Sequence, residues 1–500
     1  MNQKKLGIFL SYINIILQAG IGFIYVPLLL SYMGNEEYGL YQLIGSIIAY
    51  FSIMDFGLTS STIQGYVKYK KEDSKKILIN FLGMVKRIYF LLSFMIIILG
   101  GIFYNFLEVV FRNKLEGYLI SSAKFIFILL IFNLVVTFMG FIYRSIIMAN
   151  ERFIFLKVSD VLQLILQPIL VIIGMRIEPT AVMMVIIITI CNIVLFFIRK
   201  FYCYKILRVT IEYYFWDRRI FKEMKKLSLS IFIVGLADMF FWKTNQIVLG
   251  FTSGLESVTI YAIASLVFLN YMTLGTIVPS IYLPKITRLV IDKVDNSILF
   301  NEFLRIGRWQ YLLLFWVTSG FILFGKDFII LWCGINYIDA YYIILLIILP
   351  FTIDLIQTVA SVIMRAKNIY DFRAKVYIII GVLNIILSII LSSNYGVIGA
   401  GIACGISIII SNIIMNIFYK KVLLLDLGLF WENILRMSFI GSVCICGGVI
   451  LNLLFDNTIY FFIFKIIMYT ILFAIIMWSF SLNKEEKLLV KRIISGESNE

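Results

Sequence analysis

Histidine is absent from the 500-residue sequence, which also has only 6 prolines, 6 cysteines and 15% charged side chains. Without histidine, the chain lacks the commonest general base and the commonest metal ligand in proteins. The cysteines show neither a disulfide framework nor the spacing of a metal site. We therefore predict no catalytic residues, no metal site and no bound cofactor, and we do not expect an enzyme.

Apolar side chains make up 61% of the sequence, and the mean hydropathy is +0.98. These values are typical of an integral membrane protein. The net charge of +15 could indicate a nucleic-acid partner, but the basic residues lie in short segments between apolar runs, where membrane topology explains them better. Each run is long enough to cross the roughly 30 Å hydrocarbon core of a bilayer. The expected spans are 6–32, 38–60, 88–108, 119–143, 154–175, 179–198, 227–250, 256–282, 305–325, 339–364, 374–393, 396–419, 430–454 and 458–481.

Lysine and arginine are sorted to one side of these spans. When the connections between spans, together with the span ends next to them, are numbered alternately from the N-terminus, one set holds 37 of the 44 basic residues and the other holds only four. Cytoplasmic loops carry such an excess, so both termini are predicted to be cytoplasmic and the number of spans to be even. The other three, Lys124, Lys243 and Lys465, lie inside spans.

The two halves of the chain resemble each other, which favours a parallel repeat of two six-helix bundles. The aligned pairs are Gly34 with Gly254, Glu36 with Glu256 and Tyr41 with Tyr261 at a shift of 220, and Ala149 with Ala366, Phe153 with Tyr370 and Gln167 with Asn384 at a shift of 217.

The fold class expected is an all-α polytopic membrane protein with about 14 transmembrane helices, in two pseudo-symmetric six-helix lobes plus two extra C-terminal helices. The predicted divisions are a first lobe at 1–198, a cytoplasmic basic and aromatic linker at 199–226, a second lobe at 227–420, helices 13 and 14 at 421–482, and a cytoplasmic tail at 483–500.

Charged residues inside a span cost about 2.5–3.5 kcal/mol each at its centre, so they need a partner or an aqueous cavity. The seventh span places Asp238 and Lys243 five residues apart, about 140° around a helix, where they cannot pair ideally. Two interpretations stay open for Lys243: it lines a cavity, or it pairs with Asp238, Asp55 or Asp354. The candidate substrate-binding residues are Lys243, Asp238, Asn245, Gln246, Trp242, Gln18, Asp55, Asp354 and Gln357.

Three other charged residues in spans have simpler explanations. Lys124 is within two turns of the outer end of its span and can extend to the surface, and Asp160 lies close to an inner end. Lys465 belongs to the peripheral last pair of helices and could also reach the surface, so it is a weaker candidate for substrate contact.

Three motifs resemble those of a known family. They are YGLY followed by Asp55-Phe56-Gly57-Leu58 in the second span, TNQIVLG at 244–250 and YGVIGAGIACGIS at 395–407. The chain thereby resembles the oligosaccharide-flippase (Wzx-like) branch of the multidrug/oligosaccharidyl-lipid/polysaccharide (MOP) exporter superfamily. It departs from the pattern at Asn245, where aspartate is frequent in the family.

The resemblance implies a two-lobe transporter of the bacterial cytoplasmic membrane that works by alternating access. The implied substrate is a polyprenyl-diphosphate-linked oligosaccharide, moved to the outer leaflet for O-antigen, capsule, exopolysaccharide or teichoic-acid assembly. A buried cation would suit the diphosphate. Membrane lipids are expected partners, as are polysaccharide polymerase and assembly proteins, whereas nucleic acid is not. The chain shows no nucleotide-binding domain, so we expect transport to be driven by an ion gradient such as H⁺ or Na⁺, by the membrane potential or by consumption of the product outside.

Two alternatives come from the same superfamily. A cation-coupled drug antiporter needs only twelve helices, so the extra pair at 430–481 counts against it. A peptidoglycan lipid-precursor flippase also has fourteen helices, but the members of that branch carry several arginines in the first two helices, and this chain has none there. A membrane glycosyltransferase, ligase or polymerase is disfavoured because the outer loops are short.

Overall fold

The structure, a computed structural model, describes residues 3–71, 75–111, 117–292, 294–367, 369–455, 458–484 and 486–488. Side chains are described in these ranges except at 3–13, 15–16, 71, 109–110, 226–231, 233–234, 237–238, 277–278, 280–281 and 283–284. Throughout the described ranges the regular elements are helices, with no strand, which confirms the predicted all-α class.

Packing divides the chain into two compact units. The first unit comprises Met1–Ile263 with Asn384–Ala400, and the second comprises Ala264–Leu383 with Gly401–Glu500. The predicted lobe borders at 198 and 227 stay a prediction.

The elements that begin in the first unit are α1 (Gln3–Ser52), η1 (Ile53–Asp55), α2 (Leu58–Lys71), α3 (Lys75–Phe111), α4 (Gly117–Ala149), α5 (Phe153–Met175), α6 (Ala181–Phe201), η2 (Tyr202–Ile206), α7 (Arg218–Trp242), α8 (Thr244–Thr252) and α9 (Leu255–Ile291). Those that begin in the second are α10 (Asn296–Trp332), η3 (Ile335–Tyr337), α11 (Asp339–Ile356), α12 (Thr358–Ala366), α13 (Asp371–Lys421), α14 (Leu427–Leu454), α15 (Ile459–Ile476) and η4 (Met477–Ser481).

Eleven helices in the described ranges are long and apolar enough to cross a membrane. Two of them each contain two spans. α1 breaks at Gly34 (φ 74°), and α13 breaks at Tyr395 and Gly396 (φ 55° at the glycine). Glycine adopts such positive φ values at little cost, so each break permits a tight turn between two spans. With α7 and α8 forming one further span, the structure agrees with the predicted fourteen.

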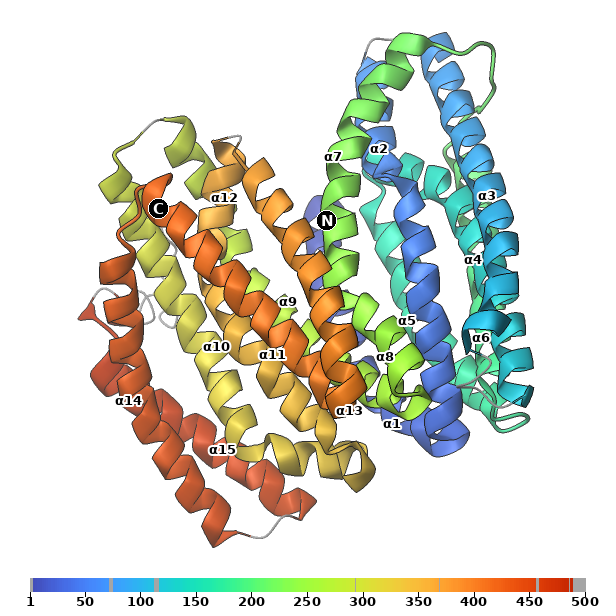
Figure 1. Cartoon of the computed structure of the whole chain (residues 1–500). Helices are drawn as coiled ribbons and strands as arrows, with labels where there is room; N and C mark the ends of the chain where they lie inside the picture. Colours follow the sequence, from blue (N-terminus) through green and yellow to red (C-terminus); the bar gives the residue numbers. More distant parts are fainter. Residues whose placement is uncertain are drawn as a thin grey trace. The chain divides into compact units, whose positions relative to one another are not determined.

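Helices of the first unit pack along their lengths. α4 contacts α3 and α6, while α5 contacts α1 and α6 (Figure 1). In the second unit α10 contacts α11, α14 and α15.

Large apolar side chains also cover the outside of the helices: on α3, Phe90, Phe94 and Phe106 are 61%, 56% and 54% exposed. A soluble protein rarely exposes such surface, whereas lipid accommodates it.

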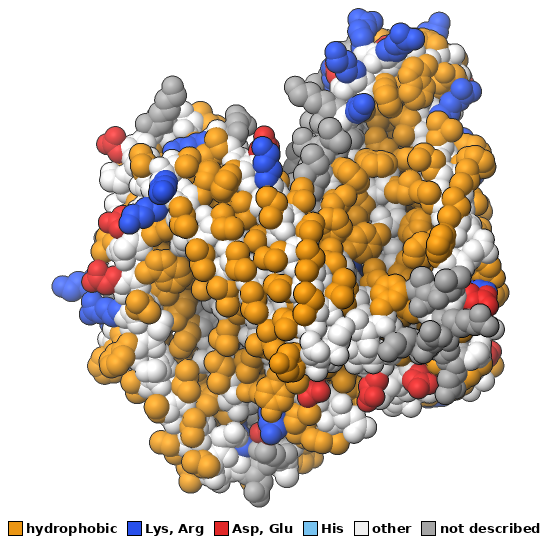
Figure 2. Space-filling view, in the orientation of Figure 1, with side chains coloured by type: hydrophobic (Ala, Val, Ile, Leu, Met, Phe, Trp, Pro, Cys, Tyr) orange, Lys and Arg blue, Asp and Glu red, His pale blue; other side chains and the backbone are white. Residues whose placement is uncertain are grey.

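In the first unit, exposed basic and acidic side chains lie at opposite ends of the helices. In Figure 2 the blue Lys and Arg side chains of the first unit gather at the tip formed by α2, α3 and α7, red acidic side chains lie at the opposite end, and the side between them is mostly orange. The exposed basic residues at this tip include Lys68, Lys70, Lys75, Lys76, Lys222 and Lys225, and the exposed acidic residues at the other end include Glu36, Glu108 and Glu256. The chain is therefore built as a multi-pass membrane protein.

The internal repeat is visible in the backbone. Gly34 and Gly254, aligned by the shift of 220, both adopt positive φ, 74° and 88°, at the turn that follows the first span of each half. Ala149 and Ala366, aligned by the shift of 217, are the last residues of α4 and α12. The prediction of two pseudo-symmetric halves is thus confirmed.

The linker after α6 is held against α3. The Oδ1 of Asn80 accepts hydrogen bonds from the backbone amides of Tyr214 (2.9 Å) and Phe215 (3.0 Å), and the Arg87 guanidinium lies 3.4 Å from the centre of the Tyr213 ring. A Cβ added at Gly83 would lie 2.2 Å from a linker carbonyl oxygen. The segment between η2 and α7 is therefore docked on its own unit and is not a loose tether.

The charge distribution leads to a topology prediction. Cysteines placed at Asn35, Gly254 and Asn394 should react in sealed cells with a membrane-impermeant maleimide, because they lie at turns on the predicted outer side. Cysteines at Lys70 and Lys222 should react only after permeabilisation. Labelling of the Lys222→Cys protein in sealed cells would overturn the orientation.

Candidate functional site

Lys243 lies where the seventh span breaks. Its φ and ψ of −112° and −27° separate α7 from α8. The hydroxyl of Thr244 contacts the Tyr50 hydroxyl and donates to the carbonyl of Met239 at 3.4 Å. Such a bond from a side chain competes with the regular helical pattern. The break therefore places a half-buried ammonium group within a membrane span.

The carboxylates considered as partners for Lys243 have contacts of their own. Asp55 accepts hydrogen bonds from the hydroxyls of Tyr89 (3.0 Å) and Thr59 (3.3 Å), at the point where the second span breaks. Asp354 accepts from Arg373. The side chain of Asp238 is not among those described. No described carboxylate lies within ion-pairing distance of Lys243, so of the three proposed pairs only that with Asp238 stays open.

The amide residues next to Lys243 pack inside the first unit. Asn245 is fully buried, and its Nδ2 donates to the Tyr261 hydroxyl at 2.8 Å while its Oδ1 accepts from Asn384 at 3.3 Å. Gln246 is also buried and accepts from the hydroxyl of Ser46. Trp242 ends α7, with its ring 6.0 Å from that of Phe241. The bonds of the two amides join α8 to α1, α9 and α13.

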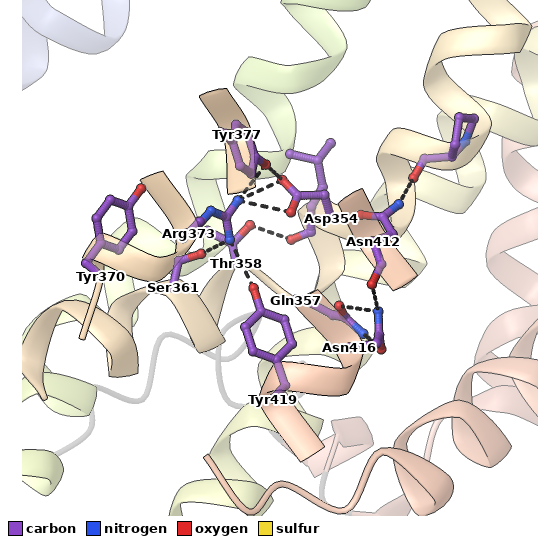
Figure 3. A network of polar contacts seen from close by, with 12 residues as sticks. Asp354, Gln357, Thr358, Ser361, Tyr370, Arg373, Tyr377, Asn412, Asn416 and Tyr419 are labelled. Atoms are coloured by element: carbon purple, nitrogen blue, oxygen red, sulfur yellow. Dashed lines mark hydrogen bonds and ion pairs between the residues drawn. The ribbon is translucent and has the colours of Figure 1, made fainter. Parts of the chain in front are cut away.

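A closed network surrounds Asp354 in the second unit (Figure 3). The NH2 group of Arg373 donates to both Asp354 oxygens at 3.0 Å, and the Tyr377 hydroxyl donates to Asp354 at 3.0 Å. The NH1 group of Arg373 donates to the Tyr419 hydroxyl at 3.0 Å and to the hydroxyl of Ser361. Arg373 and Asp354 are each only 9% exposed. Opposite charges therefore neutralise each other inside this cluster.

Gln357 extends the same network. Its side-chain amide exchanges hydrogen bonds with that of Asn416, at 2.9 and 3.2 Å. The indole of Trp431 on α14 donates to Asn416 at 3.2 Å. The contacts of Asp354 and Gln357 thus connect α11 and the α11–α12 junction to α13 and α14 in the second unit.

Gln18 lines a pocket of about 450 Å³ within the first unit. The pocket lies among α1, α4, α5 and α6, and its other charged and amide residues are Asn14, Arg144, Lys157, Asp160, Gln163, Gln167, Asn192 and Arg199. From the sequence, the basic residues of this pocket were assigned to the cytoplasmic ends of spans, and Asp160 was not included among the candidate substrate-binding residues. Arg373 of the second unit was missed for the same reason, because a basic residue near a span end has the same sequence signature as a topological charge.

Two lysines within spans have structural partners. Lys124 pairs with Glu108 at 2.5 Å near the acidic end of the first unit, as expected for a side chain that reaches the surface. Lys465 is only 1% exposed and donates to Asn452 at 2.9 Å. It therefore does not extend to the surface as expected: α14 supplies an amide acceptor that holds the ammonium group inside the second unit.

Residues 5–290 match the family described as "Polysaccharide biosynthesis protein". The chain belongs to this family. The predicted membership of a polysaccharide biosynthesis family is thereby confirmed. Among curated proteins no sequence matches the chain.

Solved structures share the fold of this polysaccharide biosynthesis protein. The lipid II flippase MurJ, in an inward closed conformation, is 18% identical with a TM-score of 0.75, and the match covers 98% of this chain and 99% of MurJ. An inward-facing multidrug resistance MATE family transporter of the MOP superfamily is 13% identical with a TM-score of 0.64, covering 82% of this chain and 98% of that one. A MOP superfamily transporter from Pyrococcus furiosus is 12% identical with a TM-score of 0.52, covering 85% and 96%.

Proposed function

We propose that the protein moves polyprenyl-diphosphate-linked oligosaccharides from the cytoplasmic to the outer leaflet of the bacterial cytoplasmic membrane. The observation that carries this proposal is membership of the polysaccharide biosynthesis family over residues 5–290. Such a carrier must accept a dianionic diphosphate, a hydrated sugar chain and an apolar tail. The tail can stay in the bilayer, so only the head group needs a polar path.

Two observations fit a head group of this kind. Lys243 places a cation inside a span with no described carboxylate paired to it, and a desolvated ammonium group favours an anionic ligand. The pocket of the first unit adds amides that can bind hydroxyl groups. We propose alternating access of the two lobes as the mechanism, with H⁺ or Na⁺ as a coupling ion and with polysaccharide polymerase or assembly proteins receiving the product.

The peptidoglycan lipid-precursor flippase is the second candidate. The specific observation in its favour is the match to nearly the whole of MurJ, which includes the last two helices, whereas the MATE transporter covers 82% of this chain. At 18% identity, this similarity shows a shared fold and does not by itself identify the substrate. The first two spans contain no lysine or arginine, which favours another lipid-linked glycan.

A reconstituted flipping assay tests the function. Liposomes containing the full-length protein and a polyprenyl-diphosphate disaccharide with a fluorescent sugar label should lose nearly all fluorescence to an external quencher. Protein-free vesicles should lose only the outer-leaflet fraction. Parallel vesicles with labelled lipid II, or with a cationic dye under a pH gradient, represent the two alternatives. Transport of the dye alone would contradict the proposal.

A further inference from the structure

The pocket of the first unit carries an excess of positive charge that its own residues do not neutralise. Asp160 pairs with Arg199 at 2.5 Å and lies 3.6 Å from Arg144. Lys157 lines the same pocket, and no described carboxylate pairs with it. Three cations in the pocket therefore share one carboxylate.

Arg199 is held deep in this pocket. Its side chain is only 12% exposed, and its Nε is buried without a hydrogen-bond acceptor in the described structure. An unsatisfied buried donor on a charged group costs more than a neutral one, because the group has lost its water. A planar guanidinium with a free N–H matches the geometry of an oxyanion such as phosphate.

A chain of amides lies beside the charged end. The Nε2 of Gln163 donates to Asn192 at 2.5 Å and to Gln167 at 3.3 Å, and the Nδ2 of Asn192 donates to Asn133 at 2.7 Å. Carboxamides carry both donors and acceptors, which is what the hydroxyl groups of a sugar require. The volume of about 450 Å³ falls in the range of roughly 300–1,000 Å³ found for small-molecule sites.

In the second unit, the region related to this pocket by the internal repeat contains a basic and an acidic side chain that neutralise each other. The shift of 217 places Thr137, Asp160 and Arg199 on Asp354, Tyr377 and Asn416, and places Leu156 on Arg373. In the second unit the equivalent positions form the closed pair of Arg373 and Asp354. The first unit has Leu156 and Thr137 in place of Arg373 and Asp354, so it lacks this closed pair, and its own positive charge has no equal counter-charge. This difference argues for a ligand in the first unit.

We propose that the pocket among α1, α4, α5 and α6 binds a sugar phosphate, with Arg144, Lys157 and Arg199 on the phosphate and the amides on the sugar. The inference rests on the proposed function, since it assigns part of the head group to a site separate from Lys243. The same oxyanion chemistry could come from a phospholipid head group, so the test distinguishes the two sources.

The test measures binding to the full-length protein in phosphatidylcholine nanodiscs by saturation-transfer NMR. Glucose 1-phosphate should bind more tightly than methyl glucoside or inorganic phosphate. Arg199→Gln should weaken this binding at least tenfold. Lys157→Gln should do the same without breaking an ion pair, so it keeps the test valid if Arg199→Gln misfolds. Lys200→Gln is the matched control, because it removes an adjacent positive charge that does not line the pocket, and it should leave binding unchanged.

The Asp160→Asn variant distinguishes an anion site from a cation site by the direction in which binding of glucose 1-phosphate changes. Removing the carboxylate frees the two arginines, so binding of glucose 1-phosphate should be retained or tightened. Loss of binding in this variant would contradict an anion site, as would equal binding by wild type and Lys157→Gln.

Two further outcomes are decisive. If added phosphatidylglycerol displaces glucose 1-phosphate, the pocket belongs to a lipid head group and the sugar phosphate assignment is wrong. Because no transport is measured, failure here leaves the flipping assay unaffected, and failure of flipping leaves the binding result unaffected.

Discussion

Replacing Arg373 by methionine should destabilise the protein by about 3–5 kcal/mol, because Asp354 is then buried without a counter-charge. The guanidinium makes both Asp354 contacts and also binds Tyr419 and Tyr377. Denaturant unfolding of the purified protein in mixed micelles, followed by tryptophan fluorescence, measures the change. The double variant Arg373→Met/Asp354→Asn should recover a large part of the loss, since no uncompensated charge remains.

The matched control is Arg365→Met. Arg365 is an exposed arginine on α12 whose guanidinium lies 4.6 Å from the centre of the Tyr370 ring and whose NH2 group donates to the Tyr370 hydroxyl at 3.1 Å. Its loss should cost no more than about 1 kcal/mol. Equal destabilisation by the two single variants, or a double variant no better than Arg373→Met, would show that the buried ion pair is not what stabilises this cluster.

Much of the fold could be predicted from the sequence because a bilayer imposes a simple pattern. Spans must be apolar over a fixed length, and loops on one side attract lysine and arginine, so hydropathy and charge fix the number of helices without any tertiary information. The repeat could be predicted because Gly34 and Gly254 occupy turns that need positive φ. The break at Lys243 leaves no comparable pattern in the sequence, whereas the break at Asp55 lies beside Gly57, another glycine with positive φ (68°).

The candidate site was harder to predict, because the same residue type serves topology and function. Arg144, Arg199 and Arg373 lie near span ends, where basic residues are ordinary, and only the structure shows them turned into polar clusters. The sequence did point to Asp354 and Gln357 as unusual groups within a span. It could not show that their partners come from α13, since a contact across 19 or 59 residues depends on helix packing.

Lys243→Ala should abolish or sharply reduce export. A charge-assisted hydrogen bond to a desolvated diphosphate oxygen contributes about 1.5–3 kcal/mol, so its loss should lower transport on the order of 10- to 100-fold. Lys243→Arg should retain part of the activity, because the charge survives while the geometry changes. The measurement is complementation of a flippase-deficient strain, with the membrane level of each variant determined by immunoblotting.

Lys124→Ala is the matched control, since Lys124 is also a lysine within a span but is already paired with Glu108 at 2.5 Å. It should export normally. If Lys243 instead has a structural role, a neutral double variant with its partner should restore export. Asp55 and Asp354 have other partners, so Asp238→Asn is the second change to combine with Lys243→Ala. Restoration by that pair would make Lys243 structural, and normal export by a well-expressed Lys243→Ala protein would exclude any role in binding the diphosphate.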